Sequence, residues 1–215
     1  MNLSENLNES FSFLSKAFDD LGNLILLIVF WIIPIADIVA LGYYADIVRR
    51  GRMIEVPPKF ENFGKLFVDG LKVFVASLIY AIVPLLIMLA GMMPMITGTS
   101  FLYGGSNMFL IFFGTYMILA MVLLFIFMLV GIVAIGYMIR TGEFGKIFAF
   151  GEIFDIIKRI GWGSYLLWYI VISVIGYICA SIPYVGMVLL AIYELFASRS
   201  LALLLDEAGV VPSSG

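Results

Sequence analysis

The feature that most constrains this chain is a long stretch without charge: no Asp, Glu, Lys or Arg occurs from Val73 to Ile139. A helix that crosses the hydrocarbon core of a bilayer needs about 20 apolar residues, so the stretch is long enough for two crossings. The segment "TGTSFLYGGSN" (97–107) lies between them, and its Gly, Ser and Asn residues favour a turn. The sequence therefore predicts two membrane-spanning helices, at about 73–96 and 108–139.

The composition extends this interpretation to the whole chain. Residues of the AVILMFWYC class make up 63 % of the sequence, charged residues 13 %, and the mean hydropathy is +1.13, whereas soluble domains have about 25 % charged residues. We therefore expect an all-α integral membrane bundle, surrounded by the lipid bilayer. It forms one transmembrane domain over 1–205, followed by a polar tail over 206–215. Apolar runs predict further spans at about 21–47, 164–182 and 184–205, which gives about five.

Pro34 leaves the first of these spans open to two interpretations. A proline removes a helical hydrogen bond and kinks or breaks a helix. A single span over 21–47 is favoured, because no second turn signal flanks the proline. The alternative is a helical hairpin of residues 21–33 and 35–48, which returns the N-terminus to the other side of the membrane.

The basic residues predict the orientation. Most of the 12 Lys and Arg residues lie in two short segments between predicted spans. By the positive-inside rule, these charged loops face the cytoplasm, so we expect a multi-pass protein of the cell membrane. With five spans, the N-terminus is outside and the C-terminus inside. The bases expected to set this topology are Arg49, Arg50, Arg52, Arg140, Lys158 and Arg159.

Two segments combine apolar and charged faces at helical spacing. Over residues 1–20 the pattern predicts an amphipathic helix that lies in the membrane interface. The face predicted to be buried consists of Leu3, Leu7, Ser10 or Phe11, Leu14 and Phe18. The second segment follows Pro57 and Pro58, and we expect a short helix on the cytoplasmic surface that is suited to docking. Its apolar face consists of Phe60, Phe63, Phe67, Leu71 and Phe74.

Three ionisable residues fall inside predicted spans: Asp37 in the first, and Glu194 and Arg199 in the fifth. A charge near the bilayer centre costs about 2.5 to 3.5 kcal/mol on insertion scales, so each must face the bundle, be neutralised or find a partner. One interpretation is a proton or ion path through Asp37 and Glu194. The favoured interpretation is a polar contact between helices.

The two charged loops also match each other. One shift of the sequence aligns identical or similar residues: Arg49 with Arg140, Gly51 with Gly142, Glu61 with Glu152, Phe63 with Phe154, Leu66 with Ile157, and Gly70 with Gly161. Both loops are expected on the same side of the membrane. The pattern therefore predicts a parallel internal repeat, related by an axis near the membrane normal.

The sequence disfavours catalysis. It contains no histidine and a single cysteine, Cys179, so the commonest proton shuttle and metal ligand is missing and a thiolate cluster has too few ligands. We expect no enzyme activity, no cofactor and no metal site. The basic residues form no stripe of the kind that binds nucleic acid.

Three segments carry a resemblance to a known family: "LGYYADIVRRG", "VPPKFENFGKLFVDGLKVFVASLIYAIVP" and "RTGEFGKIFAFGEIFDIIK". The chain resembles the mainly archaeal membrane family catalogued as domain of unknown function 4013, over about residues 20–205. The positions that match its pattern are Gly42, Tyr43, Arg49, Arg50, Gly51, Pro58, Phe60, Phe67, Asp69, Gly70, Tyr80, Pro84, Phe150, Gly151 and Glu152. The resemblance implies a multi-span membrane protein and supplies no activity.

Two functions remain as expectations. A membrane assembly or interaction protein, acting as a subunit or scaffold, is favoured, because docking helices and small-residue helix faces both suit contacts with other membrane subunits or with a second copy. The alternative is a small channel or secondary transporter, including one that handles lipids. It is suggested by the repeat, by prolines within spans, and by Asp37 and Glu194.

Overall fold

The computed structural model describes residues 2–97 and 106–212, and every regular element in this part of the chain is a helix. The α-helices are α1 (Leu3–Lys16), α2 (Leu21–Ile32), α3 (Asp37–Arg50), α4 (Phe63–Ile96), α5 (Ser106–Thr141), α6 (Phe150–Ile160), α7 (Trp162–Ala180) and α8 (Gly186–Glu207). Short 3₁₀ helices η1 (Ala17–Asp19), η2 (Gly51–Met53) and η4 (Phe144–Phe148) lie between them. The predicted turn falls largely on residues 98–105, and the end of the polar tail on 213–215, which lie outside the described residues.

Four helices of the described chain are long and apolar enough to cross a bilayer: α4, the Leu110–Thr141 part of α5, α7 and α8. The all-helical, membrane-embedded class predicted from the sequence is therefore confirmed. The predicted span over 21–47 is not a single helix, because α2 ends at Ile32 and α3 begins at Asp37. Ile33 adopts an extended conformation, as the ring of a following proline requires, and the break at Pro34 follows.

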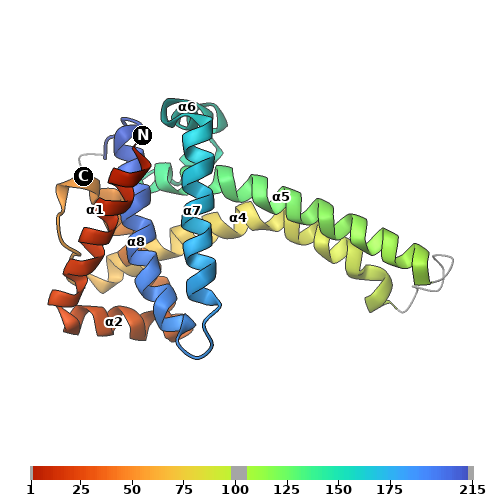
Figure 1. Cartoon of the computed structure of the whole chain (residues 1–215), viewed down its shortest axis with the longest axis horizontal. Helices are drawn as coiled ribbons and strands as arrows, with labels where there is room; N and C mark the ends of the chain where they lie inside the picture. Colours follow the sequence, from red (N-terminus) through yellow and green to blue (C-terminus); the bar gives the residue numbers. More distant parts are fainter. Residues whose placement is uncertain (1, 98–105, 213–215) are drawn as a thin grey trace. The chain divides into compact units, whose positions relative to one another are not determined.

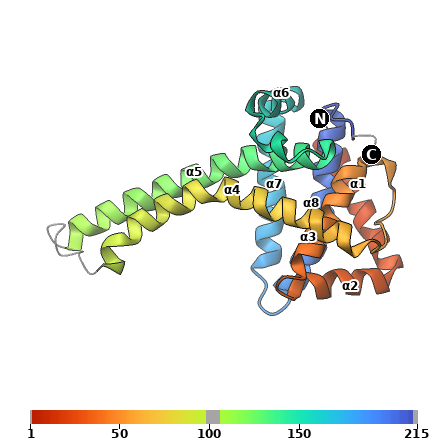
Figure 2. The same cartoon turned by 180° about the vertical axis from the view of Figure 1, so that it is seen from behind.

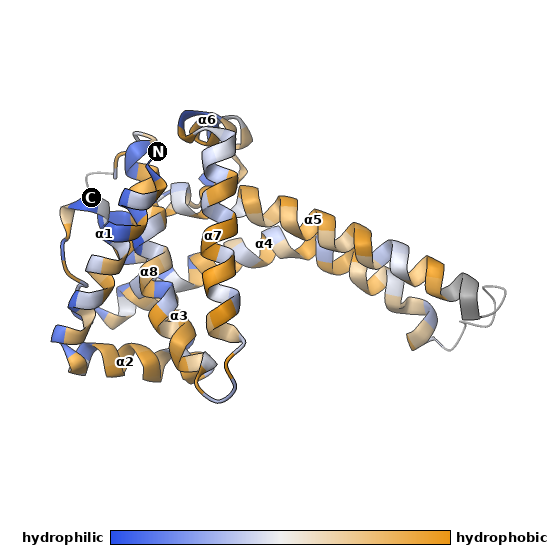
Figure 3. Ribbon diagram, in the orientation of Figure 1, coloured by the Kyte–Doolittle hydropathy of each residue, from blue (hydrophilic) through white to orange (hydrophobic). Residues whose placement is uncertain are grey.

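The chain divides into two compact units, 1–75 with 133–215 and 76–132, where the sequence predicted a single domain. The second unit combines the C-terminal part of α4 with the N-terminal part of α5 and contains no charged residue. Two glycines of this unit pack against tyrosine side chains: Gly131 lies against Tyr80, and Gly91 against Tyr116. Figure 3 shows the apolar colouring that dominates these two segments.

Large apolar side chains on the outside of the second unit are exposed. Examples from both segments are Ile82, Leu86, Met93, Ile118 and Met121, each at least half exposed. Exposed apolar surface on this scale is unfavourable in water, and it is compatible with a lipid or protein surrounding.

The first unit is built around α8, against which α1, α2, α3 and α7 all pack. Ala191, Leu195 and Leu203–Leu205 of α8 are buried there. Figures 1 and 2 both show α1 running alongside α8, and α7 leading into it through a tight connection. Pro183 lies in that connection, as the sequence predicted.

The buried face of α1 differs from the predicted one. Asn6, Ser10 and Phe13 are buried, while Phe11 and Phe18 are half exposed. The Asn6 side chain donates a hydrogen bond to the Ser200 carbonyl oxygen of α8 at 3.1 Å and accepts one from the Ser200 hydroxyl. Hydrophobic spacing placed Ser10 on this face but missed Asn6, a polar side chain that is buried because α8 satisfies its hydrogen bonds. The N-terminal helix is therefore a packed part of the first unit.

The predicted repeat aligns two pairs of glycines. One pair has a similar backbone conformation at both positions, and the other pair does not. Gly51 and Gly142 follow the ends of α3 and α5, and both have positive φ, 52° and 76°. Gly161 also has a positive φ, 91°, and separates α6 from α7, whereas Gly70 lies within α4. The repeat stays a prediction.

Two glycines bring α3 and the start of α4 into backbone contact. A Cβ on Gly42 would overlap the carbonyl group of Leu66, and a Cβ on Gly70 would overlap the carbonyl oxygen of Ile38. Neither obstacle is a flexible side chain, so the helices can approach this closely only where both residues lack a Cβ. This crossing fixes the first turns of α4 on the first unit.

Replacing Gly70 with Ala tests the crossing. Gly70→Ala must push the two backbones apart and is expected to lower the free energy of unfolding by about 1 to 3 kcal/mol. Gly64→Ala is the matched control in the same helix, because nothing lies within 4 Å of its added Cβ; it should be neutral or stabilise by up to about 1 kcal/mol. SDS titration in mixed micelles, followed by tryptophan fluorescence, measures both. Equal effects of the two substitutions would contradict the crossing.

Candidate functional site, a polar network in the first unit

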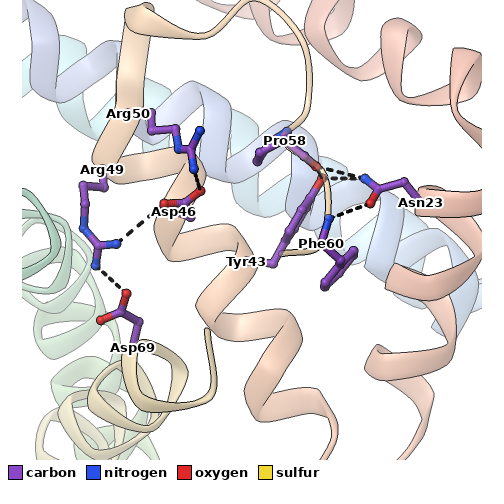
Figure 4. Close-up of polar contacts among 8 residues, drawn as sticks. All are labelled: Asn23, Tyr43, Asp46, Arg49, Arg50, Pro58, Phe60 and Asp69. Carbon is purple, nitrogen blue, oxygen red and sulfur yellow. Dashed lines mark hydrogen bonds and ion pairs between the residues drawn. The ribbon is translucent and has the colours of Figure 1, made fainter. Parts of the chain in front are cut away.

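The C-terminal end of α3 carries the first part of a charged network. Asp46 pairs with Arg50 one turn later at 2.8 Å and with Arg49 at 3.6 Å. Arg49 also reaches the carboxylate of Asp69 on α4 at 2.8 Å, as Figure 4 shows. Both carboxylates are nearly buried, with side chains about one-tenth exposed. The network therefore joins α3 to α4 beside their glycine crossing.

Arg140 forms the most buried part of the network. It lies at the end of α5, its side chain is 1 % exposed, and it pairs with Asp206 of α8 at 2.8 Å. It also donates to the Ala202 carbonyl oxygen at 2.8 Å. Gly51 fits against this pair, because a Cβ there would collide with the Arg140 guanidinium and the Asp206 carboxylate. Three segments distant in sequence thus meet at one ion pair.

Arg199 of α8 also binds the turn at Gly51, which follows α3. Its Nη1 donates to the carbonyl oxygens of Gly51 at 2.5 Å and Ile54 at 3.0 Å. Its guanidinium lies 5.0 Å from the centre of the Phe13 ring of α1, within the range of a cation–π interaction. Arg199 is therefore bound to backbone carbonyl groups and an aromatic ring.

The segment between η2 and α4 is fastened by Asn23 of α2. The Asn23 amide donates to the Pro58 carbonyl oxygen at 3.0 Å, and its oxygen accepts from the Phe60 backbone N–H at 3.0 Å. The Tyr43 hydroxyl donates to the same Pro58 oxygen at 2.8 Å, and the Tyr43 ring stacks on Phe60 with centroids 4.3 Å apart. Figure 4 shows this clamp beside the charged network.

The predicted docking helix was expected to run directly into the second span, and its residues from Phe63 onward form the first turns of α4. Phe60 is packed against Tyr43 and Phe30. The remaining members of the predicted face are exposed by between 38 % and 48 %: Phe63, Phe67, Leu71 and Phe74. We call these four residues the α4 face.

The other predicted polar site is dispersed. Asp37 lies in the first turn of α3, and Glu194 is partly buried in α8. In the described part of the chain, no hydrogen bond or ion pair joins the side chains of Asp37, Glu194 and Arg199. The Glu194 carboxylate has no such partner at all there.

The remaining predicted bases, Lys158 and Arg159, lie in the last turn of α6. Lys158 pairs with Asp155 at 3.8 Å, with both side chains about 70 % exposed. At the start of the same helix, Glu152 accepts hydrogen bonds from the Tyr137 hydroxyl and from Lys146. Both interactions hold the pKa of Glu152 below its ordinary value, the Tyr137 bond most. These groups form the solvated side of α6.

Sequence reasoning missed several members of the network. Asp46 was detectable, because its spacing to Arg49 and Arg50 is that of helical ion pairs. Asp206 and Asn23 give no local signal, since their partners lie far away in the sequence. The same holds for Trp168, which is only 2 % exposed and donates to the Ser200 hydroxyl at 2.8 Å. Within the described residues, no three His, Cys, Asp or Glu side chains gather as metal ligands.

Removing the partner of Arg140 should destabilise the fold strongly. Asp206→Asn leaves the buried guanidinium without a countercharge and is expected to lower the free energy of unfolding by about 3 kcal/mol. Asp155→Asn removes an exposed ion pair instead and should change it by less than about 1 kcal/mol. The SDS titration described above compares the two variants. A small loss for Asp206→Asn would show that the pair contributes little to the fold.

The sequence model of the family described as "Protein of unknown function (DUF4013)" matches residues 25–192, which is most of the chain and includes the α3–α4 crossing and Tyr43. Asn23, Arg199 and Asp206 lie outside the matched range. Searches of curated proteins and of solved structures returned no match. The chain therefore belongs to the DUF4013 family of proteins of unknown function.

Proposed function

We propose that the protein is a membrane assembly protein, a subunit or scaffold, that presents the α4 face to another membrane polypeptide. The observation that carries the proposal is the position of this apolar face among charges. Lys65, Asp69 and Lys72 lie in the same turns of α4, and such charges favour a position outside the hydrocarbon core. Acyl chains alone are therefore a poor cover for the face.

The length of α4 supports the same conclusion. Its 34 residues extend over about 50 Å at 1.5 Å per residue, against about 30 Å of hydrocarbon. Large apolar side chains are exposed from Phe63 to Ile96. The bilayer core can cover the uncharged part of this helix, and a partner would cover the surplus.

The face is also held rigidly. On the opposite side of the same turns, Leu66, Asp69 and Gly70 are buried, and the Asn23 clamp fixes the chain that enters the helix. A surface that is already ordered loses little conformational entropy when it binds. This favours a docking role over a mobile segment.

The proposal includes the location and the class of the protein. Arg49, Arg50 and Arg140 are expected to face the cytoplasm of the cell that makes it, in accordance with the positive-inside rule. The partner is a second membrane subunit or another copy of this chain. We propose no catalytic role, because the histidine-free sequence offers few groups for acid–base chemistry.

Phe67→Glu tests the docking role. A carboxylate in the centre of the α4 face would have to be desolvated against an apolar partner, so the complex should dissociate while the isolated chain folds normally. Lys65→Glu is the matched control, since it adds a carboxylate to an exposed position of the same helix. Native mass spectrometry after gentle detergent extraction measures the stoichiometry. An unchanged complex in Phe67→Glu, or the absence of any complex in the parent protein, would refute the proposal.

A small secondary transporter is the second candidate, and the Glu194 carboxylate favours it. This group lies within a candidate membrane-spanning helix without a hydrogen bond or ion pair in the described chain. An intramembrane carboxyl without a fixed partner is free to exchange a proton. Proton-coupled uptake of a solute is the function it would serve.

Glu194→Gln distinguishes this candidate. The substitution keeps the size of the side chain and removes its titration, so proton-coupled uptake into proteoliposomes should be lost while the protein still folds. The uptake of the parent protein under an imposed pH gradient is the reference. Equal uptake by both proteins would remove Glu194 as a coupling residue.

A further inference from the structure

A charged cleft lies between α1, the segment after η2, and α8 of the first unit. Its volume is about 300 Å³, at the lower end of the range for small-molecule sites. Glu9, Ser12, Phe13 and Lys16 line it from α1, Arg52 and Glu55 from the η2 segment, and Arg199 from α8. It is distinct from the α4 face and from Glu194.

Five of the lining residues are charged, three basic and two acidic, yet no ion pair joins them within the described chain. Lys16 donates only to the backbone oxygen of Glu55, at 3.1 Å. In another cleft of this unit, Arg50 is already paired with Asp46 at 2.8 Å. The first cleft therefore keeps both signs of charge available for a ligand.

Arg199 gives the cleft a fixed cationic wall. The residue is only 6 % exposed, and its Nη1 is bound to the carbonyl oxygens of Gly51 and Ile54. Its Nε is buried from solvent and has no partner in the described chain, so the donor left for a ligand is Nη2, which has no hydrogen bond there. A guanidinium held in place with an unused donor is suited to bind an oxyanion.

We propose that this cleft binds a phosphate group that carries a nearby ammonium group, the chemistry of phosphoethanolamine. Arg199, Arg52 and Lys16 receive the phosphate oxygens. Glu9 and Glu55 receive the ammonium group, and they disfavour a ligand that is only anionic. The inference goes beyond the proposed assembly function and stands without it.

The same chemistry has two sources, a free solute and the headgroup of a phosphatidylethanolamine lipid. Arg199 belongs to α8, a candidate membrane-spanning helix, and this is the reason to test a lipid headgroup as one of the sources. Among the lining residues, only Arg52 and Glu55 fall within the range that matches the family. The other lining residues, from α1 and α8, lie outside that range.

Binding to the full-length protein in detergent tests the site. Free phosphoethanolamine and inorganic phosphate are the two soluble probes, measured by isothermal titration. Arg52→Gln should weaken phosphoethanolamine binding about tenfold, because it removes one charge-assisted contact. Lys59→Gln is the control, since it removes a positive charge from the same loop outside the cleft.

The acidic side of the cleft provides a second, opposite readout. Glu55→Gln should weaken phosphoethanolamine and strengthen inorganic phosphate, which a general loss of structure cannot do. Both Arg52 and Glu55 are exposed, so these variants should fold, and the elution volume in size-exclusion chromatography checks this.

Nanodiscs separate the two sources. Native mass spectrometry of protein released from phosphatidylethanolamine or phosphatidylglycerol discs should show retained phosphatidylethanolamine, reduced by Arg52→Gln, if the headgroup is the ligand. Binding of free phosphoethanolamine without lipid retention assigns the site to a solute. The proposal is overturned if neither form binds, if Arg52→Gln has no effect on either, or if both lipids are retained equally.

Discussion

The charge of Arg140 is buried and needs a partner, and this requirement determines how the helices of the first unit are arranged. Arg140 lies at the end of a helix whose preceding residues are uncharged, and its side chain is almost completely buried. A buried guanidinium without a countercharge is strongly destabilising. The Asp206 carboxylate of α8 and the glycine turn after α3 must therefore lie next to the Arg140 guanidinium. The positions of α3, α5 and α8 in this unit depend on that contact, and Arg199 fastens the same turn through its backbone oxygens.

The features predicted from the sequence are those decided locally. The uncharged run from Val73 to Ile139 predicted two long apolar helices, and Pro183 predicted the tight connection before α8. Pro34 signalled a break, but whether a proline kinks or interrupts a helix depends on what its neighbours can pack against. Hydrophobic spacing also misplaced part of the buried face of α1, because Asn6 is buried by a hydrogen bond to Ser200, a residue far away in the sequence.

The candidate site was predicted as individual residues rather than as an arrangement. Arg49, Arg50 and Arg140 were recognised as a group of bases, and the structure places them in ion pairs with three carboxylates, Asp46, Asp69 and Asp206. Gly42 and Gly70 matched a family pattern, while the crossing explains why a Cβ is excluded there. Arg199 was expected to face the bundle, be neutralised or find a partner. Its partners are carbonyl oxygens and a ring, which a sequence does not identify because every residue has a carbonyl group.

The contact between α1 and α8 has a consequence for the order of folding. Asn6 and Ser200 are separated by 194 positions in the sequence, so almost the whole chain must be synthesised before this hydrogen bond can form. Until α8 leaves the ribosome, α1 has no surface on which to bury its polar stripe, and Arg140 has no Asp206. Contacts of such long range form late because the loop they close is large. The first unit can therefore be completed only after α8, its last helix, has been synthesised. By then the uncharged second unit has already been synthesised.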